Sequence, residues 1–284
     1  MKPERVSLAL SGGGMKAMAH VGVVRALAEA GIEPVEIVAV SAGALVAALV
    51  AGGLPYERIV ALVTRLHRDD LFVLNRLQLM VRGVAVPGLL KPEPLRSWLA
   101  TNIPERQFER LRVPLRIGVV NLDEGRLEVF GSQGRTDCGV DDAVYASMAL
   151  PMYLPPAVLG GATYADGGLL QVLPLELVTE GSDCVVAVDV GPAEAGHPSW
   201  RTLAPALVAL SDRVTSLMMA DQKRRTIEAW RADPTRPPLV LVEPDVDPYG
   251  TFSFDSTVDF IEAGYRAAHA ALAARRSRGA GQER

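Results

Sequence analysis

The chain has 284 residues, a formal net charge of -4, and a composition that is 49% hydrophobic but only 5% aromatic. Its length suits one large α/β domain with a substantial core. A negative net charge argues against a general nucleic-acid binder, whose contact surface would be basic. The two cysteines, Cys138 and Cys184, have no CxxC spacing, so neither a disulfide framework nor a thiolate zinc site is expected, and a reducing, cytoplasmic compartment fits.

The first fifty residues alternate between short apolar runs and helical periodicity. Glycines separate these segments, and Gly31 follows the first helical pattern as a C-terminal glycine would. The expected elements are a strand at Val6–Leu10, a helix at Ala19–Ala30, a strand at Ile37–Val40 and a helix at Ala44–Ala51. This order predicts an α/β fold in which a mostly parallel central sheet carries helices on both faces.

The stretch Ile37–Leu54 carries no charged residue and nearly reaches the length of a membrane span. It is interrupted at Ser41-Ala42-Gly43 and ends in two glycines, a pattern typical of a buried strand, a tight turn and a buried helix. We therefore expect a core segment here instead of a transmembrane helix. The apolar run at Val6–Leu10 is too short for a signal peptide.

The region Leu71–Leu90 is apolar but irregular, because arginine, glycine and proline interrupt it. Two interpretations stay open: a lid or interfacial segment, and a long packed loop. The segment before it, from Pro55 to about His67, is expected to be helical.

The second half of the chain continues the alternation. Strands are expected at Leu115–Asn121, Leu127–Phe130, Cys184–Val190 and Leu239–Val242, and helices at Pro92–Asn102, Asp141–Ala149, Trp200–Trp230 and Val258–Ala274. No linker or internal repeat divides the chain, so residues 1–274 are expected to form a single domain. Residues 275–284 are basic and polar, and we expect a disordered tail there.

A glycine-rich cluster, Ser11-Gly12-Gly13-Gly14-Met15-Lys16-Ala17, joins the first strand to the first helix. Adjacent glycines can turn backbone N–H groups toward a developing negative charge, and the helix N-terminus reinforces this. The spacing Gly12-x-Gly14-x-x-Ala17 also fits a dinucleotide-binding fingerprint. That fingerprint needs an acidic residue at the end of the second strand, where this chain has Ser41, so nucleotide binding is the weaker interpretation.

The cluster Ala39-Val40-Ser41-Ala42-Gly43 follows the second strand and is one residue short of the G-x-S-x-G nucleophile elbow. Such an elbow exposes a serine hydroxyl on a sharp strand-to-helix turn, and small neighbours make room for the strained backbone. Ala39 replaces the first glycine, and its methyl group is expected to crowd the turn. Ser41 is the candidate nucleophile.

A third cluster, Tyr164-Ala165-Asp166-Gly167-Gly168, supplies a carboxylate. An aspartate before two glycines is usually a turn former. A serine nucleophile nevertheless needs a base, and a desolvated carboxylate can serve when its pKa rises toward neutral pH. Asp166 is therefore the candidate base.

In this order, the three clusters resemble the patatin-like phospholipase family, whose signature is a G-G-G-x-[RK]-G loop, a G-x-S-x-G serine and a D-G-[GA] aspartate. The resemblance covers most of the chain, because later segments match the compact bacterial members as well: Ala146–Pro156, Val172–Pro174, Phe254-Asp255 and Ile261–Tyr265. It implies a three-layer α/β/α fold and a lipid acyl hydrolase that works through a Ser–Asp dyad. No cofactor is implied, and calcium stays open, although the sequence contains no EF-hand loop.

The resemblance assigns roles residue by residue. Ser41 matches the nucleophile and Asp166 the proton acceptor. The oxyanion loop, its basic position and the supporting turn positions match, in that order, Gly12, Gly13 and Gly14, then Lys16, then Ala39, Gly43, Gly167 and Gly168. The chain departs from the signature at Ala39 and at Ala17, which each replace a glycine.

Other interpretations remain open at this point. An α/β-hydrolase triad would need the order Ser41, Asp166, and then His197 or His269. A catalytically weak lipid-binding relative would have its elbow closed by Ala39. No metal site is predicted, because the four histidines lack ligand spacing: His20, His67, His197 and His269.

The family resemblance makes the expected partner a lipid or fatty-acyl ester substrate, without selecting its headgroup or acyl chain. For the cytoplasmic location we also expect a peripheral contact with the inner membrane surface. Neither a nucleic-acid partner nor a particular oligomeric state is indicated.

Overall fold

The computed structural model describes residues 4–82, 86–192, 206–246 and 253–282. Within them an eight-stranded sheet has the order β5-β6-β3-β2-β1-β7-β8, with β4 paired to β3. The strands are β1 (Val6–Leu10), β2 (Pro34–Val40), β3 (Leu115–Asn121), β4 (Arg126–Gly131), β5 (Ala157–Leu159), β6 (Ala162–Asp166), β7 (Cys184–Val188) and β8 (Leu239–Val242).

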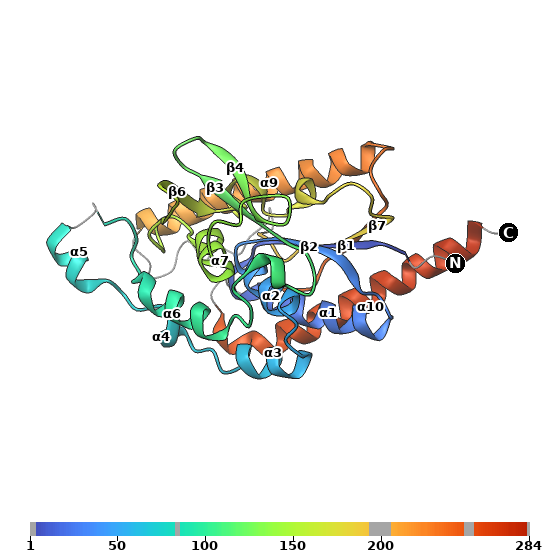
Figure 1. The fold of residues 1–284 in the computed structure, drawn as a ribbon, viewed down its shortest axis with the longest axis horizontal. Helices are drawn as coiled ribbons and strands as arrows, with labels where there is room; N and C mark the ends of the chain where they lie inside the picture. The colour runs from blue at the N-terminus through green and yellow to red at the C-terminus, as the bar shows by residue number, and fades with distance from the viewer. Residues whose placement is uncertain (1–3, 83–85, 193–205, 247–252, 283–284) are drawn as a thin grey trace.

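The central strands β3, β2, β1, β7 and β8 run parallel, while β4, β5 and β6 add antiparallel pairs at one side. Helices cover both faces of this sheet (Figure 1). They are α1 (Ala19–Glu29), α2 (Ala42–Ala51), α3 (Tyr56–Val63), α4 (Arg68–Leu71), α5 (Arg76–Arg82), α6 (Pro92–Asn102), α7 (Val140–Met148), α8 (Gly168–Gln171), α9 (Ala206–Ala232) and α10 (Thr257–Gln282). The mostly parallel three-layer fold expected from the sequence is confirmed.

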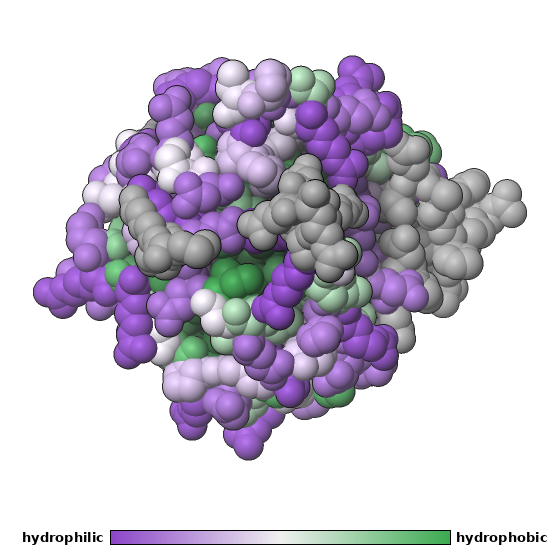
Figure 2. All heavy atoms as spheres, turned by 90° about the vertical axis from the view of Figure 1, so that its right-hand side faces the viewer, coloured by the Kyte–Doolittle hydropathy of each residue, from purple (hydrophilic) through white to green (hydrophobic). Residues whose placement is uncertain are grey.

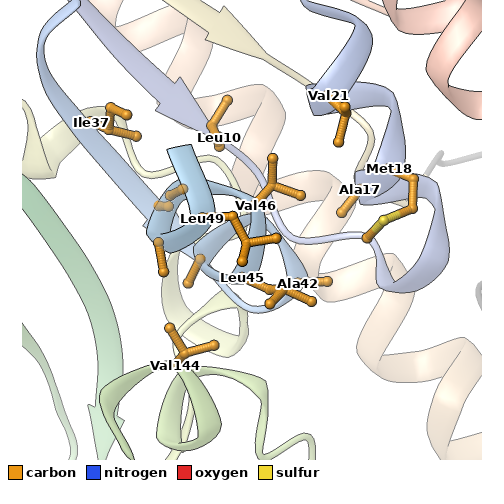
Figure 3. Close-up of a cluster of buried hydrophobic side chains, with 14 of the residues drawn as sticks. Leu10, Ala17, Met18, Val21, Ile37, Ala42, Leu45, Val46, Leu49 and Val144 are labelled. Carbon is orange, nitrogen blue, oxygen red and sulfur yellow. The ribbon is translucent and has the colours of Figure 1, made fainter. Parts of the chain in front are cut away.

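Strand alternation separates the core into two clusters, one on each face of the sheet. In β1, Leu8 and Leu10 belong to the larger cluster under α1, α2 and α10, whereas Ala9 faces the smaller cluster under α9. Both faces are therefore apolar, as a sheet buried on both sides requires. Figure 3 shows the larger cluster, with Leu45 and Val46 of α2 between the sheet and the N-terminal turn of the first helix.

The region Ile37–Leu54 forms a strand, a turn and a helix, as expected. α2 is apolar on nearly all sides because it is buried on nearly all sides. Among the described helices, none combines the length and the apolar character that crossing a bilayer requires.

Two segments differ from expectation. Asp166 ends a strand, β6, that we had not predicted, because the glycines after it suggested only a turn. Helix α10 continues through Gln282, where a disordered tail was expected from Arg275. Its alanines and arginines have high helix propensity, and Arg275 forms an ion pair with Glu4.

The region Leu71–Leu90 is neither fully a lid helix nor a simple loop. α4 ends in it, α5 lies within it, and Leu74 bridges to Leu90 in antiparallel fashion. The excursion is closed at its base by backbone hydrogen bonds from Lys91 to Val73 and from Asn75 to Leu89. α5 therefore projects from the molecule on a short, hydrogen-bonded base.

Candidate active site

Ser41 occupies a sharp turn between β2 and α2. Its backbone angles are φ 54° and ψ -137°, a left-handed conformation that strains a residue with a side chain. The Ser41 N–H donates to Ser147 Oγ at 2.7 Å, and the Ser147 hydroxyl donates to the Gly118 carbonyl at 2.7 Å. The Ser147 hydroxyl therefore fastens the strained turn to the neighbouring strand β3.

Asp166 reaches this turn because two strands share one edge of β3. β4 pairs with residues Arg116 to Asn121 along one edge of β3, so β2 and β6 both lie along the other. β2 pairs with this edge as far as Gly118. Pairing with the antiparallel strand β6 starts at the next residue, Val119, which lies opposite Asp166, the last residue of β6. The carboxyl ends of β2 and β6 consequently meet, although they are far apart in the sequence.

The two side chains are joined by a short hydrogen bond. Ser41 Oγ donates to Asp166 Oδ2 at 2.6 Å, and the other carboxylate oxygen accepts from the Gly168 N–H at 2.7 Å. Asp166 is only 2% exposed. Burial raises the pKa of its carboxyl to about 7, against the opposing effect of the two hydrogen bonds. The carboxylate is thus poised to take a proton near neutral pH.

The glycine loop lies against the same hydroxyl. A side chain at Gly12 would come within 3.0 Å of Ser41 Cβ, and one at Gly13 within 2.5 Å of the Val190 carbonyl. The Gly12 N–H already donates to the Val172 carbonyl at 2.9 Å. The Gly12 amide, which the sequence predicted as an oxyanion donor, thus already has an acceptor within the protein. The absence of a side chain at Gly12 leaves space beside Ser41.

The amides of Gly13 and Gly14 have no hydrogen-bond acceptor among the described residues. Gly14, at φ 60°, opens the 3-10 helix Gly14–Met18 that leads into α1. Both amides can therefore serve an anion held between the loop and Ser41. Lys16 is nearly buried in the next turn and lines the space next to Ser41.

The supporting positions differ in how tightly they are packed. A Cβ at Gly43 would lie 2.4 Å from the Ser11 carbonyl, and one at Gly167 would lie 2.1 Å from the Gly118 carbonyl. At Gly168 the nearest atom would be Asp166 Oδ1, at 3.0 Å. Ala39 of β2, by contrast, is fully buried in the larger of the two core clusters. A side chain at Gly43 would therefore collide with the backbone of Ser11, whereas the Ala39 methyl group is part of the core packing.

Sequence reasoning missed the residues that hold the glycine loop. Ser11 Oγ accepts from the Val190 N–H at 2.9 Å, and its carbonyl lies 2.9 Å from His20 Nε2. Burial lowers the pKa of His20 to about 4, so the ring is neutral and donates through Nε2. Beyond Val190, Asp189 pairs with Lys223 of α9 at 2.7 Å. A serine after a strand and a lysine inside a long helix gave no sequence signal for these contacts.

Among the described histidines, none hydrogen-bonds Ser41 or Asp166. His20 is engaged by Ser11, His67 caps α4, and His269 lies on α10 beside Tyr265, with ring centroids 6.2 Å apart. His197, the other triad candidate, lies outside the described residues.

Two hollows meet at the hydroxyl and share Gly14, Ser41, Leu150 and Asp166. One hollow is apolar and is lined further by Met15, Met18, Leu45, Leu66, Leu71, Phe72, Leu95, Met148, Tyr153, Leu154 and Phe254. The other contains polar groups, including Lys16, Asp212, Thr215 and Ser216. A molecule bound across both would have one apolar and one polar part, with the bond between them beside Ser41.

Gly43 and Ala39 are expected to respond in opposite ways to substitution. Gly43→Ala should lower the ester hydrolysis that the family resemblance implies by about tenfold or more, because the new Cβ pushes Ser11 and the glycine loop away from Ser41. Ala39→Gly should leave the hydrolysis rate within about threefold and reduce the free energy of unfolding by about 1 kcal/mol, since glycine weakens a strand. Kinetics and urea unfolding of both variants check this. A rate change larger in Ala39→Gly than in Gly43→Ala would contradict it.

Comparison with known proteins places the chain by sequence. The family model described as patatin-like phospholipase matches residues 8–179, which is more than half of the chain and includes all three clusters. An uncharacterized NTE family protein of Mycobacterium bovis is 30% identical over 193 residues, covering 68% of this chain and 51% of that protein. The lysophospholipase nte1 of Emericella nidulans is 29% identical, covering 92% of this chain and 18% of that protein.

The chain therefore spans about half the length, or less, of these curated relatives. Among solved structures, VipD from Legionella pneumophila shares the fold, with a TM-score of 0.54 at 18% identity, over 96% of this chain and 67% of that one. The family model, the order of the clusters and the fold agree. The chain belongs to the patatin-like phospholipase family.

Proposed function

We propose that the protein is a serine acyl hydrolase that cleaves fatty-acyl esters of lipids through a Ser41–Asp166 dyad. The observation that carries this proposal is the 2.6 Å hydrogen bond from Ser41 Oγ to a buried carboxylate whose pKa is raised to about 7. Relatives named lysophospholipase, such as nte1 of Emericella nidulans, support a lipid ester as the substrate.

In the proposed first step, Asp166 Oδ2 takes the proton of Ser41 as Oγ attacks the ester carbonyl carbon. The carbonyl oxygen becomes an oxyanion, and the amides of Gly13 and Gly14 donate to it. When the tetrahedral intermediate collapses, the alkoxide leaving group takes the proton from Asp166 and departs as an alcohol. The acyl group remains on Ser41.

In the second step, water replaces the alcohol. Asp166 accepts a proton from the water as its oxygen attacks the acyl-enzyme, and it returns that proton to Ser41 Oγ when the fatty acid leaves. A single carboxylate thus acts alternately as base and as acid. A pKa of about 7 suits both roles, because the proton must be neither too weakly nor too strongly held.

The two hollows support this choice of substrate. In the proposed complex the fatty-acyl chain enters the apolar hollow, which Phe72 and Leu45 line, and the polar alcohol enters the hollow lined by Asp212 and Ser216. The scissile ester would then lie at the residues that both hollows share. Of the two histidines that a Ser–Asp–His triad could use, His269 stands beside Tyr265 on α10 and hydrogen-bonds neither Ser41 nor Asp166, and His197 lies outside the described residues.

An active-site serine probe tests the proposal. A fluorophosphonate should label the wild-type protein at Ser41, as identified by peptide mass mapping. Labelling should be slowed or lost when Gly43→Ala displaces the oxyanion loop, because the probe forms the same tetrahedral geometry. Labelling at another serine would refute the Ser41–Asp166 dyad, and no labelling at all would favour a non-catalytic lipid-binding relative.

A further inference from the structure

The helix α5 exposes apolar side chains that nothing described in the structure covers. Leu77, Met80 and Val81 are 73%, 85% and 76% exposed. Figure 1 shows α5 projecting from the body at the end opposite the two termini. The face that carries the termini is largely hydrophilic, with apolar side chains only in small patches (Figure 2). Several strongly exposed apolar residues on one short helix indicate a surface that binds something.

A second exposed apolar stripe runs along the first half of α9. Its members follow helical spacing on one face and are Leu210, Val214, Leu217 and Met218. Asp212 and Ser216, on the neighbouring face of the same helix, line the polar hollow beside Ser41. The helix thus borders the candidate active site with one face and exposes an apolar stripe with the next.

Hydrogen bonds through Tyr153 connect the base of the α5 excursion to helix α9. The base of the α5 excursion is bonded to the segment before β5, through the Leu90 N–H to the Tyr153 carbonyl at 2.9 Å. The Tyr153 hydroxyl in turn lies 3.4 Å from Asp212 Oδ1 on α9. Tyr153 also lines the apolar hollow. The base of the α5 excursion and helix α9 are therefore both joined to Tyr153, a residue that lines the apolar hollow.

The charge around α5 favours an anionic partner. The protein as a whole has a net charge of -4, yet residues 71–92 contain Arg76, Arg82 and Lys91 and no acidic residue, while Asp69, Asp70 and Glu93 lie just outside this span. Apolar side chains with cationic neighbours are typical of elements that lie at the boundary between headgroups and acyl chains. Anionic lipids attract such cations, whereas a second copy of this acidic chain offers them less.

We propose that α5 and the exposed stripe of α9 form a membrane-docking surface that places the mouth of the apolar hollow against an anionic bilayer. This inference rests on the proposed function for its purpose, because a docked enzyme would draw an acyl chain directly from the bilayer. Its physical basis, exposed apolar and cationic residues on elements joined through Tyr153, is independent of the chemistry at Ser41.

Binding is best measured on Ser41→Ala protein, in which turnover does not alter the lipid. We expect co-sedimentation with vesicles of phosphatidylcholine and phosphatidylglycerol, and weaker binding to phosphatidylcholine alone. Leu77→Asp/Met80→Asp should reduce partitioning by about tenfold or more, because charges replace the inserted side chains. Arg76→Glu/Lys91→Glu should reduce partitioning into the anionic vesicles by about fivefold or more for each reversed charge, and it should leave partitioning into the phosphatidylcholine vesicles unchanged.

Two controls make the result specific. Arg231→Glu reverses an exposed arginine in the last turn of α9, away from the α5 surface, and should bind as Ser41→Ala does. In the wild-type background, Leu77→Asp/Met80→Asp should retain hydrolysis of a short soluble ester while losing hydrolysis of vesicle lipid. Loss of both activities would mean that the variant is misfolded, and Met80→Ser then replaces it in the binding assay.

Unchanged vesicle binding by Leu77→Asp/Met80→Asp, or equal binding to both vesicle types by all variants, would overturn the docking surface. So would a wild-type dimer that this variant converts to a monomer, because the surface would then be a self-interface. The proposed function is tested separately. It fails if the fluorophosphonate does not label Ser41, regardless of the result of the vesicle assay.

Discussion

Ser41→Ala is expected to lower hydrolysis of p-nitrophenyl esters by about 10³-fold or more, because the acyl-enzyme can no longer form. Stability should change little. Alanine keeps the strained backbone at φ 54° and the N–H bond to Ser147 Oγ, and only the bond to Asp166 is lost. We expect the free energy of unfolding to stay within about 1 kcal/mol of wild type.

The matched control for this variant is His269→Ala. His269 makes no hydrogen bond to Ser41 or Asp166, so turnover should stay within about threefold of wild type, whereas removal of a triad histidine costs about 10³-fold or more. Near-wild-type activity in Ser41→Ala would eliminate the dyad. A large loss in His269→Ala would replace it with a triad.

Asp166→Asn should lower hydrolysis by about 10³-fold while making the protein more stable at neutral and alkaline pH. The amide cannot accept the Ser41 proton as the carboxylate does, so general base catalysis is lost. The folded-state pKa of Asp166 is about 7, above its usual value of 3.8, because burial penalises the charge. Charging this buried carboxylate therefore weakens the fold, and asparagine removes that cost.

The sign of the pH dependence follows from proton binding. Between the usual pKa of 3.8 and the folded value of about 7, the folded state binds more protons at Asp166 than the unfolded state does, so stability falls as pH rises. The stability gain of Asp166→Asn should be near zero around pH 4 and reach on the order of 4 kcal/mol above pH 7.

Thermal unfolding and ester hydrolysis across this pH range test both effects. Wild-type activity should rise with pH through about 7, as Asp166 ionises, and the stability difference should grow over the same interval. A wild-type profile that is flat through neutral pH would mean that Asp166 is not the base. A stability gain that is constant from acid to alkaline pH would mean that asparagine acts through packing.

The sequence predicted the parallel part of the fold well, because each of its strands is a short apolar run and the helices between them are either periodic or, like α2, apolar throughout. It did not predict β6, which carries Asp166. This strand has five residues, and its partner β5 has three, too few for alternation to show. The Asp-Gly-Gly motif predicted a turn, and in the structure this turn directly follows the last residue of β6.

The candidate residues were identified by order and type, and their placement required the fold. Nothing local to Gly12 indicates that its amide is engaged by Val172. Ser147 likewise lies within a helical pattern, and only the sheet brings its hydroxyl to the Ser41 turn. From the sequence, the Ala39 methyl group was expected to crowd the elbow. In the structure the position without room for a side chain is Gly43.

The shared edge of β3 has a consequence for folding. Ser41 and Asp166 are 125 residues apart, and they meet only when β2 and β6 have both docked on the same edge. Contacts of such long sequence separation form slowly, because the intervening chain must first be ordered. Helix formation, by contrast, is local and fast. Recovery of hydrolysis during refolding therefore reports completion of the sheet, and it lags behind the recovery of helical signal.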